Sequence, residues 1–173
     1  MKNFIFIDLF TQKGFIENFG SQAIWDCPEI RENLMDATAI AIRNKIPIYS
    51  FMYTGFESTD FEKVADTETE DMSFEPNNNP LQLLIRTNSF TDFPLPELDY
   101  SDKVIFIYGV PAEISVINFV KNNADKFAKM WIVQDAIKAA HSSDYKDEDL
   151  LAELKALGAK LITTRNLEKY ITI

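Results

Sequence analysis

The sequence has 173 residues, of which 46% are hydrophobic and 25% are charged, and this predicts one folded domain over residues 1–173 rather than a disordered chain. Seventeen basic residues against twenty-seven acidic ones leave a net charge of -10, so nucleic acid and anionic membrane surfaces are excluded as general partners. A single cysteine, Cys27, excludes an internal disulfide and a cysteine-cluster zinc site, and a single histidine, His141, excludes a histidine-rich metal site.

Six short runs of apolar residues predict six strands. In chain order they are Phe4–Ile7, Ile46–Met52, Leu81–Ile85, Val104–Tyr108, Met130–Val133 and Ala159–Thr163. Most are continuously apolar rather than alternating, which is typical of strands covered on both faces. The first run follows Met1, Lys2 and Asn3 directly, without the pattern of a signal peptide, and no apolar run is long enough to cross a membrane. We therefore expect a cytoplasmic protein.

Amphipathic stretches between the strands predict helices that begin near Pro28, Pro111 and Tyr145. The predicted apolar stripes are Ile30, Leu34, Ala37 and Ala41 in the first helix, Ile114, Ile117, Val120 and Ala124 in the second, which runs to about Phe127, and Leu150, Leu154 and Leu157 in the third, which stops at Gly158. Strands that alternate with helices predict an α/β domain. Its core is a doubly wound, six-stranded parallel sheet with helices on both faces and right-handed connections.

The connection over residues 54–80 is unusually long and acidic. Its eight carboxylates and one lysine account for seven of the ten net negative charges. One interpretation is a solvated excursion with a short helix near residues 58–65, and another is a lid or an oligomer contact. The spacing of the carboxylates matches no calcium-binding loop, which argues against a metal site.

Candidate functional residues lie where predicted parallel strands end or where the following helices begin, because ligands bind at this edge of open α/β sheets. Asp8 follows the first apolar run, Arg86 the third and Gly109 the fourth, while Ser115 opens the next helix. A carboxylate at the end of a central strand needs a partner. It has a catalytic interpretation and two structural ones, a salt bridge to Arg86 or a cap on a helix amide.

Four segments resemble the isochorismatase-like cysteine hydrolases, the superfamily that includes the nicotinamidases. Ile5–Asp8 resembles the opening strand with its catalytic aspartate, and Ile107–Val116 resembles the strand-to-helix turn Gly-Val-Ala-Thr-Asp-x-Cys-Val. Trp131–Ala136 and Leu157–Thr164 are similar to later family segments, so the likeness covers nearly the whole chain in order. The resemblance implies a single isochorismatase-like domain with strand order 3-2-1-4-5-6.

The family's active site contains an aspartate, a lysine and a nucleophilic cysteine. The resemblance places Asp8 at the aspartate's position, Arg86 at the lysine's and Ser115 at the cysteine's. A serine hydroxyl is much harder to deprotonate than a thiol, whose pKa is about 8.5. Arg86 stays protonated, so it cannot shuttle a proton, and beside Asp8 it would weaken that carboxylate as a base.

The family also uses a cis peptide in this turn to aim backbone amides at an oxyanion. Pro111 accepts either a cis or a trans bond to Val110. We expect the helix start at Ile114 and Ser115 to offer unpaired amides, and Val110, Pro111, Ile114 and Phe10 to line a ligand pocket.

Two functions are compatible with these residues. The first is a divergent protein that lacks the family's hydrolase activity and binds a small anionic or carbonyl ligand or a protein partner. The alternative is an active hydrolase of a small amide, ester or enol ether, with Ser115 as nucleophile, Asp8 as base and the 114–115 amides as oxyanion hole. The resemblance also implies a homo-oligomer. We expect no organic cofactor, since five glycines are too few for a dinucleotide fingerprint, and no metal.

The single cysteine and histidine allow structural interpretations. Cys27 precedes Pro28 near a predicted helix start, where it is either a displaced nucleophile or a buried structural thiol. His141 lies beyond the fifth predicted strand, where we expect a solvated loop residue.

Overall fold

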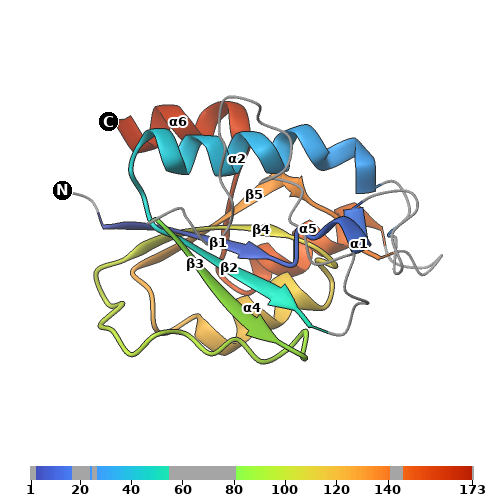
Figure 1. Cartoon of the computed structure of the whole chain (residues 1–173), viewed down its shortest axis with the longest axis horizontal. Coiled ribbons are helices and arrows are strands. Elements are labelled where there is room, and N and C mark those ends of the chain that lie inside the picture. The colour runs from blue at the N-terminus through green and yellow to red at the C-terminus, as the bar shows by residue number, and fades with distance from the viewer. Residues whose placement is uncertain (1–2, 17–23, 25–26, 55–80, 141–145, 173) are drawn as a thin grey trace.

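The computed structural model describes residues 3–16, 24, 27–54, 81–140 and 146–172. At its centre lies a sheet of six strands in the order β3-β2-β1-β4-β5-β6, and every neighbouring pair is parallel (Figure 1). The predicted fold class and strand order are confirmed.

The strands agree closely with the apolar runs of the sequence. They are β1 (Phe4–Leu9), β2 (Ile48–Tyr53), β3 (Gln82–Thr87), β4 (Val104–Gly109), β5 (Lys129–Ile137) and β6 (Lys160–Ile162). Every residue of β1 is buried, because strands flank it on both sides and helices cover both of its faces. Strand β3 lies at the sheet edge, and only its first residue, Gln82, is buried.

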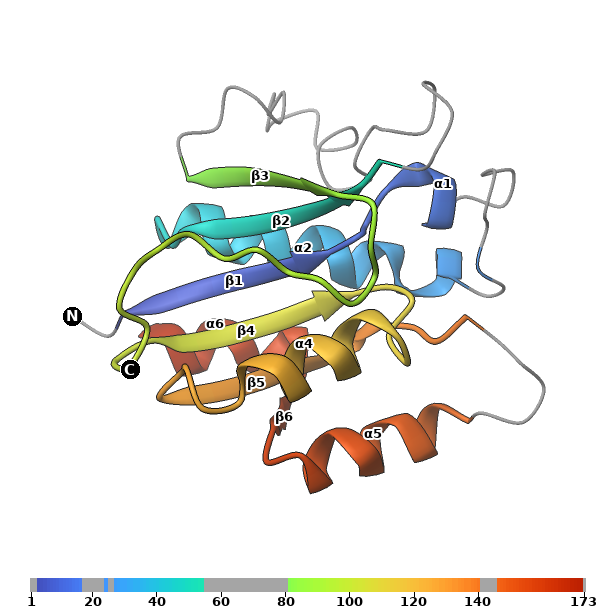
Figure 2. The same cartoon turned by 90° about the horizontal axis from the view of Figure 1, so that it is seen from below.

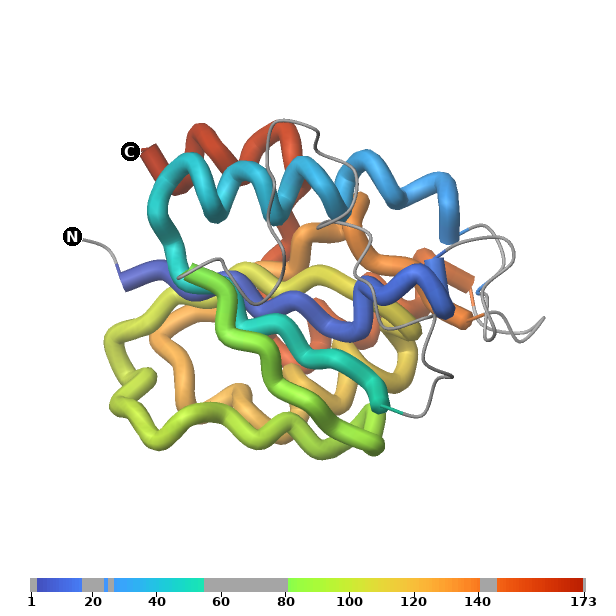
Figure 3. The backbone as a smooth tube through the Cα atoms, in the orientation of Figure 1, coloured from blue at the N-terminus to red at the C-terminus, as the bar shows by residue number. Residues whose placement is uncertain are grey.

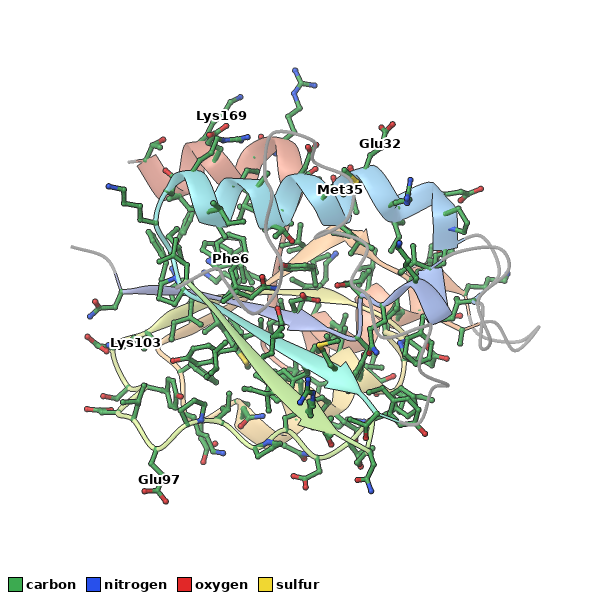
Figure 4. All side chains as sticks on the ribbon, viewed as in Figure 1. Phe6, Glu32, Met35, Glu97, Lys103 and Lys169 are labelled. Atoms are coloured by element: carbon green, nitrogen blue, oxygen red, sulfur yellow. The ribbon has the colours of Figure 1, made fainter. Side chains whose placement is uncertain are left out.

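Helices cover both faces of the sheet. They are α1 (Lys13–Ile16), the 3-10 helix η1 (Cys27–Ile30), α2 (Arg31–Arg43), α4 (Ser115–Asn123), α5 (Asp147–Ala156) and α6 (Thr164–Thr172). Helices α2 and α6 lie on one face, and α4 and α5 lie on the other (Figure 2). The charged ends of Glu32 and Lys169 point outward from α2 and α6 (Figure 4).

Aromatic side chains form much of the core between these layers. Phe106 of β4 lies 5.0 Å from Phe6 and 5.9 Å from Tyr170 of α6, measured between ring centres. On the other face, Phe51 of β2 lies 6.2 Å from Phe119 of α4. Each face of the sheet is therefore joined to its helices by rings, which bury large apolar areas.

The helix starts differ from the sequence-based expectation. Pro28 lies in η1, so the first crossover begins with a 3-10 turn before α2, although its predicted stripe of Ile30, Leu34, Ala37 and Ala41 is buried as expected. Helix α4 begins at Ser115 rather than Pro111. Ile117 and Val120 of its predicted stripe are buried as expected, and Val116 and Phe119 are buried beside them. Ile114, by contrast, is exposed. Ala124, predicted on the buried face, is exposed too.

The third crossover ends as predicted. Leu150 and Leu154 are buried in α5, and Gly158 follows the helix with a φ of 89°, a left-handed conformation that suits glycine. Tyr145, His141 and all but Thr54 of the acidic connection lie outside the described residues. Among the helices that the structure describes, none is long and apolar enough to cross a bilayer.

Candidate functional site

Asp8 lies near the carboxyl end of β1, the central strand on which the candidate site depends. It is level with Ser50 of β2 and with Tyr108 of β4. Residues in register on neighbouring parallel strands point to the same face of the sheet, so Asp8 and Ser50 are side by side. Only 1% of Asp8 is exposed, so its carboxylate must find its hydrogen-bond partners inside the protein.

Neutral hydroxyl groups bind the two oxygens of this carboxylate. The Thr11 hydroxyl donates to Oδ1 at 2.7 Å, and the Ser50 hydroxyl donates to Oδ2 at 2.8 Å. The Ser50 oxygen in turn accepts a hydrogen bond of 2.9 Å from Nε2 of Gln82. Asp8, Ser50 and Gln82 thus form a buried polar chain that links three neighbouring strands.

Arg86 lies two strands away from Asp8, at the sheet edge. It is level with Met52 of β2, whereas Leu84, two residues earlier, is the β3 residue level with Ser50. Two strand spacings amount to about 10 Å across the sheet. Arg86 is exposed, and no ion pair joins it to Asp8 in the described part of the chain.

The turn after β4 has a backbone that only glycine accommodates. Gly109 has a φ of 133°, and a Cβ built there would lie 2.0 Å from the carbonyl oxygen of Leu9. The next amide, that of Val110, donates to this same oxygen at 2.9 Å, and the Val110–Pro111 bond is cis. Gly109 therefore lets the turn pack directly against the end of β1.

Ser115 is fully buried at the start of α4. Its hydroxyl donates to the carbonyl oxygen of Pro111 at 2.8 Å, and its amide donates to the same oxygen at 2.8 Å. The amide of Ile114 also donates to this oxygen, at 3.2 Å. The expectation that the 114–115 amides are unpaired is therefore wrong, because the first turn of the helix uses both of them.

The residues predicted to line a ligand pocket are mostly part of the core. Phe10 is fully buried, with a left-handed φ of 57°, and its ring lies 5.1 Å from that of Phe90 and 6.1 Å from that of Phe93. Val110 and Pro111 are buried as well. Ile114, which is 39% exposed, is the one of the four predicted lining residues that reaches the surface.

Sequence reasoning did not identify Ser50, the partner of Asp8, or Lys138, which contacts the turn before α4. Ser50 interrupts an otherwise apolar strand, which was a usable signal of a polar partner for a buried charge. Lys138 follows β5 and is buried. Its backbone oxygen accepts from the Ala112 amide, and its ammonium pairs with Asp147 at 3.3 Å and more loosely with Glu29 at 3.9 Å. This lysine fastens the turn before α4 to the start of α5.

Cys27 is the buried first residue of η1 and is not a candidate nucleophile. Burial raises the pKa of its thiol to about 12, and the nearby Lys138 ammonium lowers it only partly. The thiol is therefore neutral at physiological pH, in agreement with a structural role. Within the described ranges, no three His, Cys, Asp or Glu side chains are grouped as a metal site would require.

No family model matches this sequence, and no curated protein does. Solved structures do match. A pyrazinamidase/nicotinamidase from Streptococcus mutans UA159 superposes with a TM-score of 0.72 at 14% identity, covering 92% of this chain and 99% of that one. An isochorismatase-like hydrolase from Alkaliphilus metalliredigens gives 0.69 at 12% identity, covering 97% and 98%. The chain has the isochorismatase-like hydrolase fold.

This fold does not by itself determine an activity. The MAR1 ribonuclease from Caenorhabditis elegans also superposes with a TM-score of 0.72, at 15% identity, over 96% of this chain and 80% of that one. Proteins of one fold carry out unrelated reactions, so the activity of this chain has to be inferred from its own residues.

Proposed function

We propose that this isochorismatase-like protein lacks cysteine-hydrolase activity and binds a small anionic or carbonyl-containing ligand or a protein partner. The observation that carries the proposal is the hydrogen bond of 2.8 Å from the Ser115 hydroxyl to the Pro111 carbonyl oxygen. A serine nucleophile must transfer its proton to a base as it attacks. An amide oxygen is a far weaker base than a carboxylate or an imidazole, so this hydroxyl is not activated.

The other two predicted catalytic residues support the same conclusion. Asp8 is held by the hydroxyls of Thr11 and Ser50, and no hydrogen bond joins it to Ser115 in the described part of the chain. Arg86 is exposed at the sheet edge. Concerted proton transfer requires a nucleophile and a base within hydrogen-bond reach. These three side chains do not form such a group.

The expected ligand is anionic because of the charge at this edge. Arg86 lies near the carboxyl end of β3 and exposes a guanidinium, which binds carboxylate or phosphate groups in a bidentate manner. A cytoplasmic location and a homo-oligomeric state belong to the proposal as well. Light scattering that gives the mass of a single chain would contradict the homo-oligomer.

Hydrolysis assays test the proposal. Purified protein would be incubated with nicotinamide, pyrazinamide, isochorismate and a set of small esters and carbamates, beside a nicotinamidase as positive control. We expect the wild type and Ser115→Ala to be equally inactive. Turnover by the wild type that disappears in Ser115→Ala would overturn the proposal and establish the alternative, a serine-dependent hydrolase.

A further pair of variants separates a lost nucleophile from a reshaped site. Ser115→Cys introduces the thiol that the resemblance implies at this position. The double variant Ser115→Cys, Arg86→Lys introduces both the thiol and the lysine. We expect both to remain inactive, because Asp8 is engaged with hydroxyls and Arg86 lies at the edge. Activity gained by either variant would show that only the reactive group had been replaced.

A further inference from the structure

A cavity of about 640 Å³ opens at the edge of the sheet where the strands begin. It is lined by the start of β1, by the segment between α2 and β2, and by the end of α6. Figures 2 and 3 show the start of β1, this segment and the C-terminal end of α6 gathered on one side of the molecule. Asp8 lies near the opposite, carboxyl edge, so the cavity is separate from the candidate site.

One part of the cavity lining is apolar and belongs to the hydrophobic core, and the rest is polar or charged. Phe4, Ile5, Ile46 and Tyr49 line the cavity, and all four are buried members of the hydrophobic core. Leu98 also lines it, and 60% of this side chain is exposed. The cavity therefore combines an apolar interior with an exposed leucine at its opening, a surface suited to an apolar molecule of limited size.

Lys45 places a positive charge beside this apolar wall. It lines the cavity and is exposed, and no residue of the described chain forms an ion pair with it. Its φ is 55°, in the left-handed region, directly after the end of α2. Glycine is the residue that this helix-terminating position favours.

A second lysine contributes less charge. Lys103 lines the cavity, and Figure 4 shows it at this edge of the molecule. Its ammonium is paired with Asp102, whose carboxylate also accepts a hydrogen bond from Asn3. Among the lining residues that the structure describes, Lys45 is thus the cation without a carboxylate partner. Because the chain carries a net charge of -10, an anion would be repelled by the protein as a whole and needs such a local cation.

We propose that this cavity binds a small molecule with an apolar body and one carboxylate group, with the body against the apolar wall and the carboxylate at Lys45. The volume falls within the range of about 300–1,000 Å³ that is typical of small-molecule sites. This site is independent of the function proposed above, because it uses none of the residues at the carboxyl edge.

Titration calorimetry with octanoate and octanamide tests the ligand chemistry. These probes have the same apolar body and differ in charge. We expect octanoate to bind at one site and about fivefold more tightly than octanamide, the size of effect typical of an exposed charge pair. Equal affinities, or no saturable binding of octanoate in the millimolar range, would overturn the proposal.

Substitutions of Lys45 test the location. Lys45→Gly removes the ammonium and relieves the left-handed backbone, so binding should weaken about fivefold without loss of stability. Lys45→Arg keeps a cation and should bind octanoate like the wild type. The matched control is Lys146→Gly, which removes an exposed lysine at the start of α5, outside the cavity. Wild-type affinity in Lys45→Gly would refute the assignment.

Leu98 provides an independent test at the opening. Leu98→Glu introduces a carboxylate that repels the probe, whereas Leu98→Gln is a neutral control of similar size. We expect Leu98→Glu to bind octanoate more weakly than Leu98→Gln by at least about fivefold. Sedimentation would be measured in parallel. A dimer that dissociates in Leu98→Glu and excludes octanoate in the wild type would show instead that a second copy covers this surface, and would overturn the proposal.

Discussion

The Ser115 hydroxyl donates its hydrogen to the carbonyl oxygen of Pro111, four residues earlier, at 2.8 Å. The same oxygen accepts the amides of Ile114 and Ser115, so three donors converge on one acceptor at the start of α4. These hydrogen bonds pair the Ser115 hydroxyl and both amides within the first turn of the helix. They give Ser115 a structural role at the position to which the sequence resemblance assigns a nucleophile.

Removing this hydroxyl should cost little more than one buried hydrogen bond. We expect Ser115→Ala to fold and to lose about 1 kcal/mol of unfolding free energy in urea denaturation. Thr172→Ala is the control, because Thr172 makes a similar bond to the backbone of Glu168 on an exposed helix end. Its loss should stay below about 0.5 kcal/mol. Equal effects of the two substitutions would contradict the role given to Ser115.

Asp8 should matter as an acceptor of two hydroxyl hydrogens. In Asp8→Asn, the side-chain NH₂ group replaces one accepting oxygen and faces a hydroxyl of Thr11 or Ser50. We expect a loss of about 1–3 kcal/mol in unfolding free energy, because one buried donor is left without an acceptor. Asp92→Asn changes an exposed carboxylate and should be nearly neutral. An unchanged urea midpoint for Asp8→Asn would show that the polar chain does not stabilise the sheet.

Gly109→Ala should be the most damaging of these substitutions. The new Cβ would overlap the Leu9 carbonyl oxygen, which is backbone of the central strand and cannot move aside, and φ would remain positive. We expect a loss above about 4 kcal/mol, or insoluble protein. Gly158→Ala is the matched control, since its φ is also positive but no atom lies within 4 Å of the added Cβ. It should lose only about 1 kcal/mol. Similar losses for both would mean that the close approach is not important.

The buried thiol of Cys27 predicts a specific loss of stability at alkaline pH. Burial raises its pKa to about 12 in the folded protein, compared with 9.0 for a solvent-exposed thiol. Above pH 9 the unfolded chain releases this proton while the folded chain retains it, so unfolding is favoured as the pH rises from 9 toward 12. The contribution falls by about 1.4 kcal/mol per pH unit within this window.

Comparison with Cys27→Ala isolates this effect from other alkaline titrations. The difference in unfolding free energy between the wild type and the variant should be constant below pH 9 and should shift against the wild type between pH 9 and 10.5. A difference that does not vary with pH would show that the thiol is not desolvated in the folded protein.

The strands were predictable because burial on both faces leaves a direct pattern in the sequence. Every residue of β1 is buried, and this burial explains the run of four apolar residues that precedes Asp8. The phase of the helix after Pro111 was not predictable in the same way. The middle of the predicted stripe, Ile117 and Val120, is buried, but Val116 and Phe119 share the buried face, and Ile114 lies in the turn before the helix and is exposed.

The surroundings of Asp8 could be predicted only in part. The resemblance located the carboxylate, but its partner Ser50 lies 42 residues later and is brought level with it by strand register. Apolar patterns carry no information on register between strands. For the same reason the sequence could not show that Arg86 lies two strands away, beyond Leu84, or that Gln82 completes the polar chain.

The accessibility of position 115 is the most direct test of whether Ser115 is a buried structural residue rather than a nucleophile. Ser115→Cys would be treated with iodoacetamide at mildly alkaline pH, with peptide-resolved mass spectrometry, and Cys27 serves as a buried reference in the same molecule. We expect that neither cysteine is alkylated in the native protein and that both react in urea. Rapid native alkylation at position 115, with Cys27 still protected, would show an accessible nucleophile position and would contradict the claim that this site is catalytically silent.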